Sequence, residues 1–276
     1  MSILDEPKID CHCHVLDPAR FPYVRDTKYR PSGQEVAPVD HFLRIMDLHG
    51  VRHALVVGTN SAYSEDLSPV FDAVARGDGR LKGIAVVAND IKGAELERLK
   101  ARGIIGVSFN GTFYDPSYYA GAHELLRNLT SLDLILQLQV KEDQLLDFLP
   151  IIDRTEVRLV IDHCGKPVPE RGVEQAGFQA LLQIGRSRRA SVKVSGFSQF
   201  SRERYPYRDV RPFVDALVAA FTFDACMWGS DWPFLRATER MDYGPLLQLV
   251  EELVPNEGDR NKLFWETPRR IFGFHA

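Results

Sequence analysis

Ile9-Asp10-Cys11-His12-Cys13-His14 ends the first strand-like run of the chain and places two histidines two residues apart. An open, doubly wound α/β sheet usually follows its first strand with a glycine-rich turn that binds phosphate. This chain has histidines at that place instead. Alternate residues of a β-strand face the same side, so we expect both histidines and Asp10 on one face and the two cysteines on the other.

Apolar runs of strand length recur along the whole chain. They lie at residues 8–14, 53–59, 81–87, 103–109, 133–140, 158–164, 190–196 and 225–231. Several are continuous rather than alternating, which is typical of parallel strands covered on both faces. Segments with helical spacing lie between them, at 39–49, 68–76, 94–101, 118–129, 141–152, 174–188 and 209–220, with a last pair at 244–253 and 259–272. Eight strands, each followed by a helix, predict an α/β protein whose residues 1–276 form a single-domain (β/α)8 TIM barrel.

The composition describes a globular chain with ample apolar material for a core. Of its 276 residues 45% are hydrophobic and 26% are charged, and 34 basic and 38 acidic side chains give a formal charge of −4. Nucleic acids and anionic membranes attract net basic surfaces, so we expect neither as a partner. Apolar runs stay short of the roughly 20 residues that span a bilayer, and the first residues lack the features of a signal peptide.

The cysteines of the chain suggest buried thiols rather than disulfides or metal ligands. There are four, too few for a disulfide framework in a chain of this size. Three lie beside histidines, but strand alternation points each of them away from its neighbouring histidine. We therefore predict small buried hydrophobic thiols in a reducing compartment, and hence a cytoplasmic location.

Polar residues end three of the strand-like runs. His12 and His14 end the first run, His163 ends the sixth and Asp231 ends the eighth. The active site of a (β/α)8 barrel lies at the carboxyl ends of its strands. We therefore predict that these four side chains meet at one end of the barrel as the catalytic residues, whereas the other histidines are structural or solvated.

Three imidazoles and a carboxylate are compatible with two kinds of chemistry. The set matches the nitrogen and oxygen donors that zinc prefers, so one divalent metal, zinc, is expected among them. Without a metal, the histidines would bind a reacting carbonyl through hydrogen bonds. In either case a carboxylate close to an electrophilic centre can act as a general base.

Residues at the same strand ends, and in the loops beyond them, are predicted to contact a substrate. The loops after the first and seventh runs carry cations, which suit a carboxylate, a sulfonate or several hydroxyls. Amide side chains follow the second and fourth runs and lie in the fifth, and an indole ring follows Asp231, where it could instead pack against the last helix. The predicted contacts are Arg25, Asn60, Asn110, Gln137, Arg202, Arg204 and Trp232, with Lys28 as a further cation of the first loop.

This combination of motifs resembles the lactonase branch of the amidohydrolase superfamily. The motifs are Asp-x-His-x-His at 10–14, Ile161-Asp162-His163-x-Gly165-Lys166-Pro167 and Trp228-Gly229-Ser230-Asp231-Trp232-Pro233. The resemblance covers nearly the whole chain, because 82–87 and 106–110 also look like strands of that branch. It implies that Asp231 is the general base that activates water. It also implies that the three histidines either ligate one divalent metal or bind a lactone carbonyl directly.

Two departures from the branch narrow what the resemblance implies. A relative that opens pyrone dicarboxylate has an arginine in its fourth strand, where this chain has Ser108. The fifth run ends Gln137-Leu138-Gln139, without a lysine that could be carbamylated to bridge two metals. Pyrone dicarboxylate as the substrate and a binuclear metal site are therefore both disfavoured.

We expect a hydrolase that opens a small lactone, the cyclic ester of an anionic or polyhydroxylated acid, with water activated at Asp231. This lactone is the expected partner, and a homo-oligomer is compatible with the sequence. The alternative is a zinc-dependent non-oxidative decarboxylase of an unsaturated or aromatic acid. Related decarboxylases often have a further histidine for proton transfer, which Val194-Ser195-Gly196 at the end of the seventh run lacks. A barrel that binds a small anion without turnover is a third class.

Overall fold

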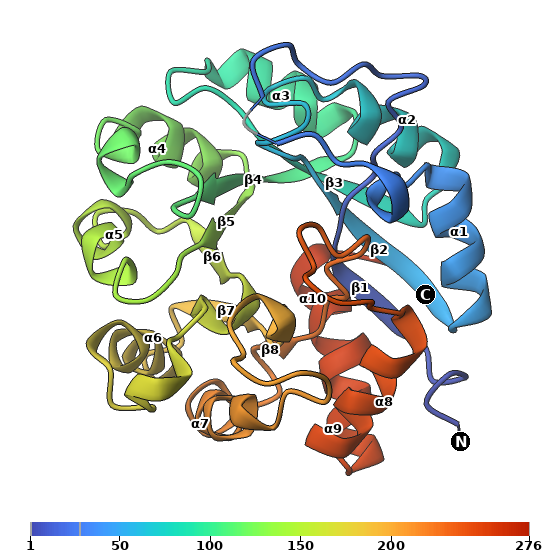
Figure 1. Ribbon diagram of the computed structural model, residues 1–276. Helices are drawn as coiled ribbons and strands as arrows, with labels where there is room; N and C mark the ends of the chain where they lie inside the picture. The colour runs from blue at the N-terminus through green and yellow to red at the C-terminus, as the bar shows by residue number, and fades with distance from the viewer. Residues whose placement is uncertain (1, 28, 276) are drawn as a thin grey trace.

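The computed structural model describes residues 2–27 and 29–275 and contains an eight-stranded parallel barrel (Figure 1). Each strand pairs with the next one in chain order. The strands are β1 (Lys8–Cys13), β2 (Val51–Val57), β3 (Leu81–Ala85), β4 (Ile104–Asn110), β5 (Ile135–Gln139), β6 (Arg158–Ile161), β7 (Ala190–Lys193) and β8 (Cys226–Met227). The predicted (β/α)8 TIM barrel is confirmed, and the loop cation Lys28 lies outside the described residues.

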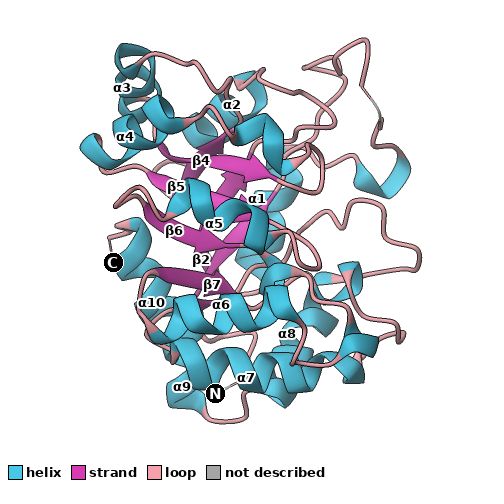
Figure 2. Ribbon diagram, turned by 90° about the vertical axis from the view of Figure 1, so that its left-hand side faces the viewer, coloured by secondary structure: helices cyan, strands magenta, loops and turns pink. Residues whose placement is uncertain are grey.

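Helices form the layer outside the strands, and long loops project beyond one end of the barrel (Figure 2). They are α1 (Val39–Leu48), α2 (Ser68–Arg76), α3 (Gly93–Ala101), α4 (His123–Ser131), α5 (Leu145–Ile152), α6 (Ala176–Arg186), α7 (Arg211–Phe221), α8 (Tyr243–Leu253), α9 (Glu257–Asn261) and α10 (Thr267–Phe272). The predicted helix at 259–272 is interrupted by a π-helical turn, Lys262–Glu266. In the described part of the chain, every helix is too short or too polar to cross a membrane.

Backbone hydrogen bonds close the barrel between β1 and the segment that follows β8. The amide of Asp231 donates to the carbonyl of His12 over 2.8 Å, and the amide of His14 donates to the carbonyl of Trp232 over 2.8 Å. The seam between the first and last strands therefore holds Asp231 beside both histidines of the amino-terminal motif.

Apolar side chains fill two layers, one inside the barrel and one between the strands and the helices. Alternate residues of β2 divide between them, because Leu55 belongs to the inner cluster and Val56 to the outer one. This division is typical of parallel strands that are covered on both faces. The four cysteines are buried and free. Members of the inner cluster include Ile9, Cys11, Leu55, Val57, Ile84, Ile135, Val160 and Met227.

Strand β1 departs from simple alternation, and the predicted orientation of Asp10 is wrong. Asp10 pairs with Ala54 and Cys13 with Val56, so β1 advances three residues while β2 advances two. The extra residue is a β-bulge, which re-aims the side chains around it. The Asp10 carboxylate accepts a hydrogen bond over 2.8 Å from the hydroxyl of Tyr243 on α8, outside the barrel, whereas His12 faces the interior.

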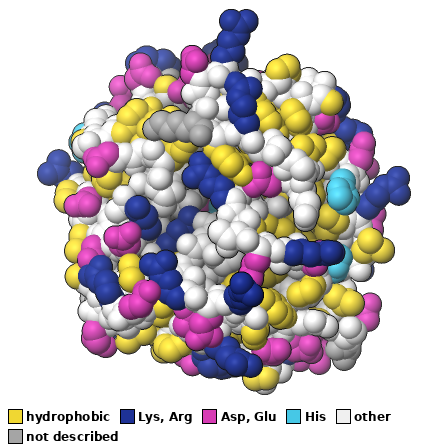
Figure 3. Space-filling view, in the orientation of Figure 1, with side chains coloured by type: hydrophobic (Ala, Val, Ile, Leu, Met, Phe, Trp, Pro, Cys, Tyr) yellow, Lys and Arg dark blue, Asp and Glu magenta, His cyan; other side chains and the backbone are white. Residues whose placement is uncertain are grey.

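Charged side chains of both signs are spread over the molecule. On the face drawn in Figure 3, lysine and arginine side chains lie among acidic ones. Many form exposed ion pairs, such as Arg158 with Asp133 at 2.8 Å and Arg189 with Asp153 at 2.7 Å. This mixture agrees with the small net charge of the chain.

Candidate active site

A cavity of about 190 Å³ lies at the carboxyl ends of the strands, where barrels of this kind carry their active sites. A volume of this size suits a small metabolite. The lining comes from seven of the eight strands or from the loops that follow them, and most of it is polar. It consists of His12, His14, Val57, Gly58, Thr59, Asn60, Ser61, Ser108, Asn110, Thr112, Phe113, Gln139, His163, Lys166, Gln199, Asp231, Leu235 and Arg236.

The three histidines and Asp231 meet in this cavity. The Nε2 atoms of His12 and His14 each lie 3.8 Å from Oδ1 of Asp231. The Nε2 atom of His163 lies 3.6 Å from the same oxygen. These separations are too long for direct hydrogen bonds and leave room for another atom among the four. The structure thus brings together the four side chains that the sequence singled out.

Hydrogen bonds at the far side of two rings orient His14 and His163. Nδ1 of His14 donates to the carbonyl of Val57 over 2.8 Å, which leaves the lone pair of its Nε2 directed at the cavity. Nδ1 of His163 forms a hydrogen bond with the Ser195 hydroxyl over 3.0 Å. Both rings therefore present Nε2 to Asp231 in a fixed orientation.

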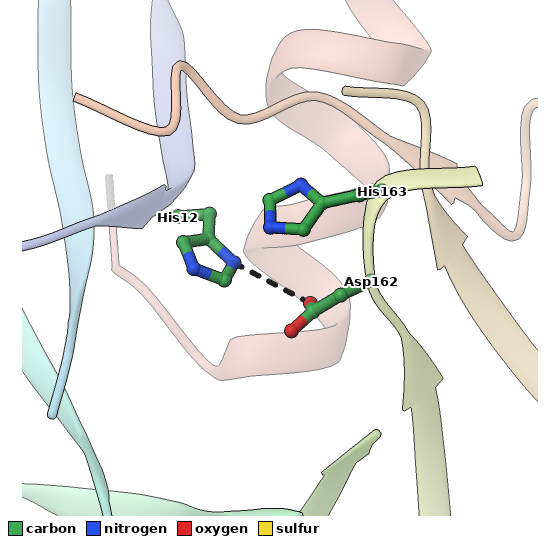
Figure 4. Close-up of side chains that lie close together, drawn as sticks. All are labelled: His12, Asp162 and His163. Atoms are coloured by element: carbon green, nitrogen blue, oxygen red, sulfur yellow. Dashed lines mark ion pairs between the residues drawn. The ribbon is translucent and has the colours of Figure 1, made fainter. Parts of the chain in front are cut away.

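His12 has a different environment, formed by two charged groups inside the barrel. Its Nδ1 lies 3.4 Å from Oδ1 of Asp162, and Figure 4 shows the two side chains facing each other beside His163. The ammonium of Lys193 lies 3.2 Å from the same Nδ1 and 2.9 Å from Asp162. Asp162, which the strand pattern turns away from His163, thus reaches the same interior.

The backbone after the strands turns these side chains into the cavity. His163 and Asp231 have positive φ angles of 51° and 61°, so simple strand alternation ends before them. Two glycines leave the space that the rings occupy. A Cβ atom at Gly196 would lie 2.6 Å from Nδ1 of His163, and one at Gly229 would lie 2.9 Å from Cβ of His12.

Burial sets the protonation states of the site. It raises the pKa of Asp231 to about 6, against the opposing effects of the Lys166 cation and the Gln199 amide. It also holds the pKa values of the three histidines below their usual range, so the imidazoles are neutral at neutral pH. The site therefore offers neutral nitrogens next to a carboxylate whose pKa suits a general base near pH 7.

The donor set fits a divalent metal ion. Tetrahedral coordination with metal–ligand bonds of about 2.1 Å places neighbouring ligand atoms about 3.4 Å apart. The Nε2–Oδ1 separations of 3.6 to 3.8 Å are close to that value. His12, Asp162 and His163 form a second group of potential ligands, but the Lys193 ammonium already neutralises its carboxylate. The set with Asp231 is thus the better candidate for a cation.

The predicted substrate contacts divide into two groups. Asn60 and Asn110 line the cavity, and Nδ2 of Asn110 donates to Oδ1 of Asn60 over 3.3 Å. Gln137 is buried and does not line the cavity, which departs from the prediction, and its Oε1 accepts a hydrogen bond from Lys193 over 2.6 Å.

The other four residues do not line the cavity, which departs from the prediction. The arginines at 25, 202 and 204 are exposed on loops, and Arg202 forms an ion pair with Glu170 at 2.8 Å. Trp232 stacks on Phe42 of α1 at 4.9 Å between ring centroids, because its side chain points to the helical layer.

Three residues near the site had no predicted role. Lys166 and Gln199 line the cavity, and the Gln199 amide donates to Oδ2 of Asp231. Lys193 is fully buried beneath His12. Lys166 lies within the Gly-Lys-Pro motif after His163, and its place in that motif could have indicated a role in the site. Gln199 ends a short 3₁₀ turn after β7, which the sequence did not predict, and a lysine inside a strand gives no sign that it points inward.

Comparison with known proteins agrees with this geometry. The amidohydrolase family model matches residues 9–274. A 4-sulfomuconolactone hydrolase from Rhizobium radiobacter is 32% identical over 274 residues, which cover 96% of this chain and 89% of the relative. A 2-pyrone-4,6-dicarboxylate hydrolase from Comamonas testosteroni is 28% identical over 280 residues, with 96% and 89% covered.

The fold also matches solved structures. A crystal structure of a probable 2-pyrone-4,6-dicarboxylic acid hydrolase from Acinetobacter baumannii, with citric acid bound, superposes with a TM-score of 0.87 at 25% identity, covering 97% of this chain and 99% of that one. Because the family model spans nearly the whole chain and the residues of the motifs meet in one cavity, this protein belongs to the amidohydrolase family.

Proposed function

We propose that the protein hydrolyses a small lactone that carries an anionic or polyhydroxylated substituent. The observation that carries the proposal is the meeting of three neutral imidazoles with the Asp231 carboxylate in a polar cavity. Two relatives whose alignments with this chain cover about nine-tenths of their own length are named as hydrolases of lactones. Their names support the same reaction class.

Asp231 is the proposed general base. Its carboxylate removes a proton from water as the water oxygen attacks the lactone carbonyl, which gives a tetrahedral oxyanion. The ring carbon–oxygen bond then breaks, and the protonated Asp231 returns the proton to the leaving oxygen. The Gln199 amide, bonded to Oδ2, keeps Oδ1 of Asp231 directed at the histidines. The product is an open-chain hydroxy or oxo acid.

The proposed cofactor is one divalent metal, zinc, held among Oδ1 of Asp231 and the histidine Nε2 atoms. When bound, zinc would act as a Lewis acid on the carbonyl and lower the pKa of water. Hydrogen bonds to the Val57 carbonyl and the Ser195 hydroxyl orient the rings of His14 and His163 for this role. Neutral imidazoles near pH 7 are the form that binds metal.

The lining of the cavity supports an anionic or hydroxylated substrate. Lys166 and Arg236 are its cations, and Arg236 lies over the ring of Tyr29 at 4.4 Å. Amide and hydroxyl side chains such as Asn60 and Gln139 supply neutral hydrogen bonds. A carboxylate or sulfonate beside Lys166 would gain a charge-assisted hydrogen bond, which is about twice as strong as a neutral one. The free, buried cysteines support a reducing, cytoplasmic setting.

A panel of lactones with a pH indicator tests the proposal. Each ring size is supplied as a pair, one lactone with a carboxylate or sulfonate and one neutral analogue. We expect one proton released for each ring opened, with higher kcat/KM for the anionic member of a pair. Carbon dioxide release from unsaturated or aromatic acids is measured in parallel. Turnover of such an acid with no lactone opened would contradict the proposal and favour the decarboxylase.

A further inference from the structure

A lysine inside the barrel, without access to solvent, contacts His12 of the proposed site. Lys193 ends β7, and its side chain is 0% exposed. Its ammonium contacts three acceptor groups, at 2.6 Å from Oε1 of Gln137, 2.9 Å from Oδ1 of Asp162 and 3.2 Å from Nδ1 of His12. The contacts with Gln137 and His12 are hydrogen bonds, and the contact with Asp162 is an ion pair. An ammonium has three N–H donors and no acceptor, so it can only donate to these groups.

The contact with His12 determines which ring nitrogen carries the proton. A proton on Nδ1 would place two N–H donors against each other at 3.2 Å, so Nδ1 must be the acceptor. A ring whose Nδ1 accepts a hydrogen bond has no proton on that atom, so the ring of His12 is neutral. A neutral imidazole carries one proton, and in His12 that proton is therefore on Nε2, the atom that faces Asp231.

His14 has the opposite arrangement, although it lies two residues away. Its Nδ1 donates to the carbonyl oxygen of Val57, which accepts and cannot donate, so its proton is on Nδ1. Nε2 of His14 thus offers a lone pair to the cavity, whereas Nε2 of His12 offers an N–H group. Only a lone pair can bind a metal, and only an N–H can donate a hydrogen bond to an oxyanion.

We propose that Lys193 is a positioning residue that holds His12 in the Nε2-protonated tautomer, so that His12 donates to the substrate oxygen while His14 remains a metal ligand. This inference rests on the proposed function for what the N–H contacts, but the tautomer itself does not depend on the substrate. The group of His12, His14 and Asp231 could hold a metal ion, and this tautomer of His12 withholds one of the lone pairs that the group needs.

The position of Asp162 allows the tautomer of His12 to be tested by replacing Lys193. Its Oδ1 lies 3.4 Å from Nδ1 of His12 and is neutralised by Lys193. In a Lys193→Met variant, Asp162 becomes the natural acceptor for a proton on Nδ1 of His12. The proton would then move from Nε2 to Nδ1 and free the Nε2 lone pair. The carboxylate–histidine pair formed in this way is the arrangement that supports metal ligands in many proteins.

Two measurements test the proposal, and neither needs turnover. Nitrogen-15 spectra of metal-free protein with labelled histidine, assigned with a His12→Asn variant, should show His12 protonated on Nε2 and His14 on Nδ1. Zinc affinity, measured by competition with a chelating dye, should rise about 10- to 100-fold in Lys193→Met, the scale of effects for groups that support metal ligands. Lys8→Met is the matched control, because Lys8 is also buried but contacts the carbonyl of Glu6.

The outcomes separate this inference from the proposed reaction. A spectrum with His12 protonated on Nδ1 in the wild type would overturn the inference, and so would unchanged or weaker zinc binding in a folded Lys193→Met variant. The wild-type spectrum decides the tautomer by itself if that variant fails to fold. Failure of the lactone panel would remove the proposed reaction and leave both readouts of the tautomer intact.

Discussion

Asp231 and Lys166 place opposite charges in the same cavity, and burial brings both pKa values toward neutrality. Burial raises the pKa of Asp231 to about 6 and lowers that of Lys166 to about 8. Below the first value Asp231, the proposed base, is protonated and cannot accept a proton from water. Above the second value the lysine loses the charge that would hold an anionic substituent. Asp231 and Lys166 therefore limit the proposed reaction of an anionic substrate to a range of about two pH units.

We expect kcat/KM for an anionic lactone to rise as the pH increases through about 6 and to fall above about 8. In Lys166→Arg the descending limb should disappear, because a guanidinium stays protonated, while the ascending limb due to Asp231 remains. Initial rates between pH 5 and 9 measure both limbs, with a neutral lactone as the control substrate. An unchanged descending limb in Lys166→Arg would show that another group causes it.

At the scale of elements, strand ends and their neighbouring glycines determine the site. Gly229 follows β8 and lies against β1, so that a Cβ atom there would be 2.9 Å from both the backbone nitrogen and Cβ of His12. The bulge in β1 also determines the orientation of His12, because it turns His12 inward and Asp10 outward. The orientation of His12 therefore depends on two strands that are far apart in the sequence.

Replacing Gly229 with alanine should displace His12 and lower kcat. A shift of about 1 Å in a reacting group can reduce the rate by about 100-fold. The matched control is Gly121→Ala, since a Cβ atom at Gly121 meets no other atom within 4 Å. Steady-state kinetics and circular dichroism of both variants check this prediction. Equal kcat values for the two variants would show that Gly229 does not position His12.

Sequence patterns predicted all eight strands in their order, because continuous apolar runs are typical of covered parallel strands. However, β6, β7 and β8 end three or four residues before the predicted runs do. His12, His163 and Asp231 could be found since each directly ends such a run. Lys193 was missed because the sequence pattern of a strand does not reveal a buried counter-ion. The bulge near Asp10 was missed because it depends on the register between β1 and β2, which is a tertiary property.

For the molecule as a whole, the closing helices are tied to the start of the chain by a buried ion pair. Arg260 of α9 donates through Nη2 to Oε1 of Glu6 over 2.7 Å, and both side chains are at most 7% exposed. Arg260 also donates to the carbonyls of Val254 and Pro255 over 3.0 and 2.8 Å. This cluster holds the segment before β1 against the end of the chain, beneath the barrel seam.

Glu6→Ala should lower the free energy of unfolding by about 3 kcal/mol, because it leaves the Arg260 charge buried without its counter-ion. Glu95→Ala is the control, since it breaks an exposed pair with Arg98 and should cost under about 1 kcal/mol. Urea unfolding of both variants at pH 7 gives the comparison. Equal losses of stability would show that burial does not make the Glu6–Arg260 pair special.

The central claim, that Asp231 is the base of a hydrolytic site formed with three histidines, is tested most directly by the kcat of Asp231→Asn on a lactone that the wild type opens. Asparagine keeps the shape of the side chain and cannot accept the proton of water. We predict a fall in kcat of about 100- to 10,000-fold with an unchanged fold, the usual range for general-base catalysis. A folded Asp231→Asn enzyme that retains more than about a tenth of the wild-type kcat would contradict the claim.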